Sequence, residues 1–303
     1  MEQHGSQSSE GARFAGVYTA TATPFREDGS VDLDRYQEHC AWQVEAGVAG
    51  VVPNGSLGEY ETLTDEERAA LVVAAQEAVG DRAQVVAGAS GRSGLEAARW
   101  AEHAAEVGAS GVMVLPPTSH SPTEDEVMAH YREVARVGLP IVAYNNPFST
   151  RVDLTPPLLA RLSEIPELRA VKEFSQDVRR IAQVREVAPR LEVVCGCDDL
   201  FVESMLMGAV GWIAGFVNAF PTQSVSLYER CVKGDFAGAV ELYRRMLPIL
   251  RWDADPRFIQ AIKLALEEAD RYGGPVRLPR QPLPPDDVRA VRAAARAALE
   301  AGT

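Results

Sequence analysis

The chain has 303 residues, of which 46% are hydrophobic and 24% are charged. This composition is ordinary for a globular protein with a sizeable core, excludes disorder of the whole chain, and fits one large domain with terminal additions. The formal net charge of -13 would repel the phosphates of nucleic acids and anionic membrane surfaces, so neither is an expected partner.

The N-terminal residues 1–12 (MEQHGSQSSEGA) are polar and contain neither a basic start nor an apolar stretch. They are therefore predicted to form a disordered tail and not an export signal. No apolar run in the chain reaches the roughly 20 residues that a membrane-spanning helix needs. The resulting expectation is a cytoplasmic location.

From residue 15 onward, short apolar runs rich in Val and Ala alternate with amphipathic stretches of helical period. Continuous apolar runs bounded by Gly, Pro or Asp are typical of parallel strands that are buried on both faces. The expected strands are 16–22, 50–54, 84–90, 111–117, 140–146, 168–174, 191–196 and 211–216. Eight strand-then-helix repeats predict the α/β class, with a (β/α)8 TIM barrel over residues 13–234 whose reactive face lies at the C-terminal ends of the strands.

Three sequence patterns mark where helices begin after these strands. Thr64 with Glu67, and Thr123 with Glu126, have the spacing of a capping box, in which the two residues satisfy each other's free backbone amides. Thr155-Pro156 places proline at the first helical position, where its missing N–H costs nothing. Each pattern supports a helix between two strands of the barrel.

Residues 235–303 are predicted to form a C-terminal extension of three helices, over 237–250, 256–272 and 285–302, with no strand between them. The proline-rich segment 273–285 is expected to be an extended connector held against the rest of the protein. A disordered linker is the alternative.

The cysteines and histidines do not form a metal-binding pattern. Cys40, Cys195, Cys197 and Cys231 lie in apolar surroundings without a CxxC pair, which favours buried, reduced thiols. The five histidines show neither HxH nor HExxH spacing. We therefore expect neither a metal nor another cofactor.

Lys172 is the strongest candidate for a catalytic residue. It lies in the apolar sixth strand, where a charged ammonium is costly and where desolvation lowers the pKa of the amine. A lysine with a lowered pKa can act as a nucleophile at neutral pH. Strand alternation sends Lys172 and Glu173 to opposite faces, one into the barrel and the other toward the helices. The alternative is a lysine whose ammonium merely reaches solvent.

The sequence GSLGE (55–59) directly follows the second strand. Its two glycines allow backbone amides to turn toward an anion, so Gly55, Ser56 and Leu57 are candidate ligands of a substrate carboxylate. Glu59 is expected only to brace the loop. Taken alone, the pattern also fits an ordinary turn.

Further candidates lie at the ends of other strands. Tyr144, in the YNNP sequence that ends the fifth strand, is placed to transfer a proton to or from an imine. Asn146, Gly196 and Ile213 are also expected to face the pocket. For all four residues, packing is the competing interpretation.

Five motifs occur in order: TATPF (21–25), GSLGE, YNNP, AVKE (170–173) and CGCDDL (195–200). Together they resemble the dihydrodipicolinate synthase and N-acetylneuraminate lyase family of class I aldolase-like enzymes, over about residues 13 to 300. The resemblance implies that Lys172 forms a Schiff base, that Tyr144 transfers protons, and that the Gly55–Gly58 loop with Ser56 binds the substrate's 1-carboxylate. It also implies a homotetramer built as a dimer of dimers.

The chain departs from the family's lysine-biosynthesis members at three places. Where those members have a Thr-Thr pair in the loop, this chain has Ser56-Leu57. Where they have a Tyr-Tyr proton relay after the fourth strand, it has Thr118-Ser119. Shortly after the YNxP motif, those members carry an arginine that holds a second carboxylate. This chain has Phe148-Ser149-Thr150 at that place, with Arg151 displaced by two positions. These differences disfavour synthesis of a dicarboxylate.

The segment 208–221 (GAVGWIAGFVNAFP) and the helices that follow it resemble the branch that deaminates 1-pyrroline-4-hydroxy-2-carboxylate to 2,5-dioxopentanoate and ammonia in hydroxyproline degradation. We therefore expect a deaminase that acts on a small 2-oxo acid or cyclic imine carboxylate. The alternatives are a retro-aldol lyase or dehydratase of a 2-oxo sugar acid, the synthase of the lysine pathway, and a non-catalytic protein that binds a small carboxylate.

Overall fold

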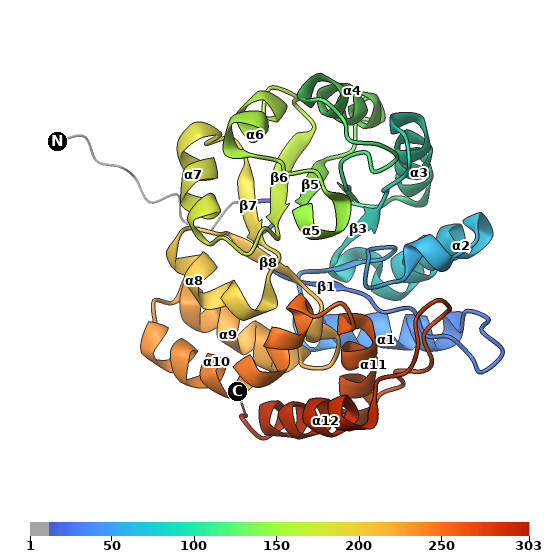
Figure 1. The fold of residues 1–303 in the computed structure, drawn as a ribbon, viewed down its shortest axis with the longest axis vertical. Helices are drawn as coiled ribbons and strands as arrows, with labels where there is room; N and C mark the ends of the chain where they lie inside the picture. Colours follow the sequence, from blue (N-terminus) through green and yellow to red (C-terminus); the bar gives the residue numbers. More distant parts are fainter. Residues whose placement is uncertain (1–11, 303) are drawn as a thin grey trace.

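Eight parallel strands close into a barrel, in which each strand pairs with the next and β8 pairs with β1 (Figure 1). The computed structural model describes residues 12–302. Residues 1–11 of the predicted tail therefore lie outside the described residues. The strands are β1 (Gly16–Ala20), β2 (Gly50–Val52), β3 (Gln84–Gly88), β4 (Gly111–Val114), β5 (Ile141–Asn145), β6 (Leu168–Glu173), β7 (Glu192–Cys195) and β8 (Gly211–Ala214). The predicted (β/α)8 TIM barrel is confirmed.

The observed strands match the eight predicted ones but end earlier. β1 ends at Ala20, where residue 22 was expected, and β4 ends at Val114, where residue 117 was expected. Pro116 and Pro117 explain the second difference, because proline has no N–H to donate to a strand ladder. The residues beyond the strand ends form the loops at the mouth of the barrel.

Helices follow each strand and surround the barrel (Figure 1). The helices between β1 and β8 are α1 (Leu33–Glu45), α2 (Asp65–Val79), α3 (Gly94–Val107), α4 (Glu124–Ala135), α5 (Pro147–Thr150), α6 (Pro156–Leu162), α7 (Arg179–Val187) and α8 (Phe201–Leu206). Both predicted capping boxes are formed, at the start of α2 and of α4, and Thr155 caps α6 with proline in its first turn. These local signals therefore set the helix starts as predicted.

The C-terminal part of the chain continues with α9 (Pro221–Val232), α10 (Phe236–Leu250), α11 (Phe258–Glu268) and α12 (Pro285–Leu299). In Figure 1, α10 to α12, in orange and red, lie together on the same side of the barrel as α9. The division between barrel and extension at residue 234 stays a prediction. No helix in the described part of the chain is long and apolar enough to cross a membrane.

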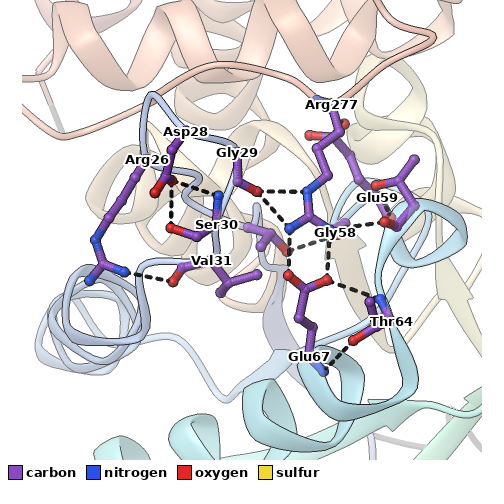
Figure 2. Close-up of polar contacts among 12 residues, drawn as sticks. Arg26, Asp28, Gly29, Ser30, Val31, Gly58, Glu59, Thr64, Glu67 and Arg277 are labelled. Atoms are coloured by element: carbon purple, nitrogen blue, oxygen red, sulfur yellow. Dashed lines mark hydrogen bonds and ion pairs between the residues drawn. The ribbon is translucent and has the colours of Figure 1, made fainter.

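The proline-rich connector between α11 and α12 is held against the barrel. Arg277 donates to the carbonyl of Gly29 from Nε at 2.9 Å and to Glu67 from Nη1 at 2.6 Å (Figure 2). Lys263 in α11 donates to the carbonyl of Pro275 at 2.7 Å. The expectation of an extended connector is confirmed, and the alternative of a disordered linker is wrong.

Candidate active site

A cavity of about 290 Å³ lies at the mouth of the barrel, where the strands end. Its strand residues are Ala20, Met113, Tyr144 and Lys172. The loop after β2, the turns after β7 and β8, and the segment between α10 and α11 form the other walls. The cavity therefore occupies the face of the barrel at which the sequence predicts reactive groups.

Lys172 points into this cavity from β6 and is 6% exposed. Burial lowers the pKa of its amine, and the negative charges of Asp253 and Asp198 oppose that effect. Gly196 makes room for the side chain, since a Cβ at this position would lie 3.1 Å from Lys172 Cε and 2.7 Å from the carbonyl oxygen of Glu173. A lysine that readily loses its proton can attack a carbonyl or imine carbon.

Glu173 takes the opposite face of β6, as strand alternation predicts. Its carboxylate accepts hydrogen bonds from Asn145 Nδ2 at 3.0 Å and from the amide of Ser175 at 2.6 Å. Glu173 does not line the cavity. Lys172 is therefore the member of this pair that is available for chemistry.

Tyr144 is the neighbour of Lys172 on β5, and its ring centroid lies 4.4 Å from Lys172 Nζ. Its hydroxyl accepts a hydrogen bond from Asn146 Nδ2 at 3.1 Å. Burial raises the pKa of the phenol, so Tyr144 is neutral at physiological pH. A neutral phenol beside the amine can pass a proton to a group bound between them.

The loop after β2 presents free amide groups. Within residues 12–302, the N–H groups of Gly55, Ser56, Leu57 and Gly58 have no acceptor in the protein. Thr23 Oγ1 donates to the carbonyl of Gly58 at 2.7 Å, which fixes the far end of the loop. Unpaired backbone amides at a cavity wall favour a bound anion such as a carboxylate.

Glu59 braces this loop from behind, as expected. It has a left-handed backbone conformation, with φ of 55°, and it is 1% exposed. Its carboxylate accepts a hydrogen bond from the amide of Arg277 at 3.1 Å and forms an ion pair with Lys263 at 2.9 Å. Figure 2 shows how Arg277 thereby joins Glu59 to Glu67. The C-terminal extension thus fixes the geometry of the loop.

Sequence reasoning missed one wall of the cavity, which the segment between α10 and α11 provides. Asp253 and Asp255 line the cavity from this segment, and Phe258 does so from the first position of α11. They lie some eighty residues after Lys172, in no strand and no recognised motif, so no local pattern marks them as part of the site. Within residues 12–302, no group of three or more His, Cys, Asp or Glu side chains is arranged to hold a metal ion.

The cavity brings together most of the predicted site residues, namely Lys172, Tyr144, Gly55, Ser56, Leu57, Asn146 and Gly196. Ile213 is fully buried within β8 and is not among the lining residues. Thr118, Ser119 and Arg151 are exposed and do not line the cavity either. The predicted cysteines Cys40, Cys195, Cys197 and Cys231 are all buried and unpaired.

A closed parallel barrel with a buried lysine and a tyrosine at its C-terminal mouth has the architecture of a barrel enzyme. A model of the Dihydrodipicolinate synthetase family matches residues 13–298. The chain therefore belongs to the dihydrodipicolinate synthase family, whose enzymes are aldolase-like lyases.

Individual relatives agree with this assignment. The chain is 33% identical over 273 residues to a 4-hydroxy-tetrahydrodipicolinate synthase from Methanospirillum hungatei, covering 88% of this chain and 93% of that protein. It is 34% identical over 278 residues to one from Methylobacterium radiotolerans, covering 90% and 92%. The solved 4-hydroxy-tetrahydrodipicolinate synthase from Methylacidiphilum fumariolicum superimposes with a TM-score of 0.90 at 28% identity, covering 95% of this chain and 97% of that one.

Proposed function

We propose that Lys172 forms a Schiff base with a small substrate that carries one carboxylate, and that the protein deaminates 1-pyrroline-4-hydroxy-2-carboxylate to 2,5-dioxopentanoate and ammonia. The observation that carries this proposal is the charge of the cavity wall. Among the described residues 12–302, Lys172 is the one basic residue that lines the cavity, and it is needed for the covalent step. This leaves the amides of the Gly55–Gly58 loop, with the Ser56 hydroxyl, as the site for a single carboxylate.

The rest of the cavity is poorly suited to a second carboxylate. Phe148, Phe174 and Phe258 supply apolar surface, and the Asp255 carboxylate, whose pKa the hydrogen-bonded Arg257 lowers, supplies negative charge. Both kinds of group disfavour an additional anion, because one offers no hydrogen bond and the other repels it. A substrate with a hydroxyl on its distal part fits this lining better than a dicarboxylate does.

The reaction can be written with all atoms accounted for. The Lys172 nitrogen bonds to C2 of the cyclic imine, and the ring nitrogen leaves C2 as a primary amine on C5. Loss of a proton from C3 and of the C4 hydroxyl as water gives a conjugated imine, with Tyr144 transferring protons. A proton moves from C5 to C3, and the enamine that results passes an N–H proton to C4, which turns the amine into an imine. Hydrolysis at C5 and C2 then releases ammonia, the dioxo acid and free Lys172. One water is consumed overall.

The names of the relatives favour a second candidate, 4-hydroxy-tetrahydrodipicolinate synthase. That reaction joins pyruvate to aspartate semialdehyde, so it shares the Lys172 Schiff base with the deaminase. It differs in needing a site for the carboxylate of the second substrate. The exposed Arg151 does not supply one in this cavity.

One experiment separates the two functions. The protein is incubated with pyruvate, with the pyrroline, and with pyruvate plus aspartate semialdehyde, and each sample is reduced with borohydride and weighed intact while ammonia is assayed. We expect adducts at Lys172 with pyruvate and with the pyrroline, whereas ammonia should come from the pyrroline alone. Lys172→Ala should give neither adduct nor ammonia. A pyruvate adduct with cyclised product and no ammonia would identify the synthase instead. The homotetramer stays a prediction, which sedimentation of the same sample tests.

A further inference from the structure

Asp253 is a buried carboxyl group at the cavity wall, contributed by the C-terminal extension. It lies in the short 3-10 helix Arg251–Ala254, which follows α10, and it is 9% exposed. Its Oδ2 accepts a hydrogen bond from the amide of Asp198 at 3.2 Å. Asp198 is fixed in turn, because its carboxylate accepts hydrogen bonds from Trp212 Nε1 at 3.1 Å and the Phe216 amide at 2.8 Å. Asp253 is thus held in place by the ends of β7 and β8.

The second oxygen of Asp253 is available to a ligand. Among residues 12–302, no group donates a hydrogen bond to Oδ1. Gly215 keeps the space beside it open, since a Cβ at that position would lie 3.3 Å from Oδ1. One oxygen is therefore anchored while the other is unpaired in the wall of the cavity.

The charges around Asp253 suit a group that exchanges protons. Lys172 on β6 is the cation that acts on it, Asp198 and Asp199 are its acidic neighbours, and its own charge acts on Tyr144. Cys195 and Cys197 also face it. Burial raises the pKa of Asp253, while the charge of Lys172 opposes this effect. In the described residues, no ion pair holds Lys172 to a carboxylate, and Lys172 and Asp253 both line the cavity.

We propose, building on the Schiff-base function above, that Asp253 is the acid–base residue that exchanges protons with Lys172 and with the group that leaves C2. The neutral amine bonds to C2, the C2=N or C2=O π pair moves to the heteroatom, and that atom takes the proton of Asp253. The Asp253 carboxylate then removes a proton from the new C–N nitrogen. The bond from C2 to the heteroatom then breaks, and its electron pair leaves with the heteroatom. Asp253 gives this heteroatom the proton that it removed from the nitrogen.

The other candidates for this role are less suitable. Thr118 and Ser119, which replace the tyrosine pair of the lysine-biosynthesis enzymes, lie outside the cavity. Burial raises the pKa of the Cys197 thiol well above its ordinary value, and Cys197 does not line the cavity. Tyr144 gives up its proton less readily than a carboxyl group does. Asp253 is the group whose acidity and position both match the step.

The test measures imine formation separately from deamination. The rate at which the intact protein gains mass with pyruvate and cyanoborohydride is followed between pH 5 and pH 9. For Asp253→Asn we expect the maximal rate to fall about 100-fold, within the range of general acid–base catalysis. Asp253→Glu should recover part of that rate, and formate should partly restore Asp253→Ala. Glu241→Gln is the matched control, because this exposed carboxylate lies on α10. The maximal rate of mass gain for Glu241→Gln should stay within twofold of the wild-type rate.

The alternative outcomes are distinct. If Asp253 only tunes the charge of Lys172, Asp253→Asn lowers the amine's pKa, so the pH profile moves to lower pH while the maximal rate is retained. That result, or failure of formate to raise the rate of a folded Asp253→Ala, overturns the proposal. A wild-type adduct at Lys172 without ammonia from the pyrroline contradicts the deaminase function alone. Absence of any wild-type adduct contradicts both.

Discussion

Tyr144 and Lys172 are register partners on neighbouring strands, β5 and β6, and the lysine nitrogen lies 4.4 Å from the centroid of the tyrosine ring. Parallel pairing sends the side chains of two register partners to the same face of the sheet. A barrel places that face around its interior, so the two groups meet at the mouth without help from a loop. The backbone ladder itself therefore sets the distance between the expected nucleophile and the expected proton-transfer group.

We predict that Tyr144→Phe separates covalent capture from turnover. The ring that faces Lys172 is kept, so the amine still forms a borohydride adduct with pyruvate. The hydroxyl that we expect to transfer protons is lost, so kcat for ammonia release should fall about 100-fold or more. An unchanged kcat in Tyr144→Phe would show that the Tyr144 hydroxyl takes no part in the reaction.

Replacing Lys172 with methionine should abolish activity and stabilise the fold. Burial lowers the pKa of Lys172, so burying this amine costs free energy on folding at pH values below the unfolded pKa. Methionine removes that cost and keeps most of the packing, with an expected gain of about 1 to 4 kcal/mol in the free energy of unfolding. Urea unfolding at pH 7 measures this gain.

The pH dependence of this gain has a definite sign. Between the lowered folded pKa and the unfolded value of about 10.4, the unfolded wild-type chain binds more protons than the folded one. Wild-type stability therefore rises with pH across that window, and the advantage of Lys172→Met should shrink toward pH 10. An advantage that stays constant between pH 7 and pH 10 would contradict a lowered folded pKa for Lys172.

The barrel was predictable because each of its signals is local. A parallel strand buried on both faces needs a continuous apolar run, and its helix needs an N-terminal cap, so both leave marks within a few residues. The same locality made Lys172 a candidate, since a lysine inside the apolar run 168–174 is conspicuous, and the structure places it in the cavity. The exact strand ends were less predictable, because pairing stops where a neighbouring strand stops.

The acidic wall of the cavity was not predictable by these means. Asp253 reaches the mouth of the barrel only because α10 packs on α9 and because the amide of Asp198 holds its carboxyl group. The second of these contacts joins residues that are 55 positions apart in the chain, although α9 and α10 follow each other directly. Ile213 shows the converse limit, since its position near a strand end suggested a lining residue, whereas its side chain is fully buried in β8.

Gly196→Ala should impair Lys172 without removing any functional group. The new Cβ would lie 2.7 Å from the carbonyl oxygen of Glu173 and 3.1 Å from Lys172 Cε. The backbone oxygen cannot move aside cheaply, so we expect a loss of about 1 to 3 kcal/mol in stability. The rate of adduct formation with pyruvate should fall at least tenfold. Mass spectrometry of the trapped protein measures that rate. An unchanged rate in Gly196→Ala would show that Lys172 does not need the space beside Gly196.

Arg277→Met tests whether the C-terminal connector orders the carboxylate-binding loop. The Arg277 guanidinium donates to Glu67 and to the carbonyl of Gly29, so loss of this side chain should cost about 1.5 to 3 kcal/mol of stability, as for hydrogen bonds to charged groups. The hydrogen bond from the Arg277 backbone amide to Glu59 is retained in the variant. The loop amides would lose their fixed direction, and KM should rise about tenfold while kcat changes less. Arg289→Met is the control, because its ion pair with Asp286 is exposed on α12.

The same variant has a predictable response to acid. The hydrogen bond from Arg277 lowers the pKa of Glu67, as does the Thr64 amide, so the folded state favours the carboxylate. A depressed folded pKa adds stability above the unfolded value of about 4.3 that is lost as pH falls through the folded pKa. The stability difference between wild type and Arg277→Met should therefore be full at pH 7 and decrease below pH 4. A difference that persists unchanged in acid would mean that Arg277 acts through the carbonyl of Gly29 and not through Glu67.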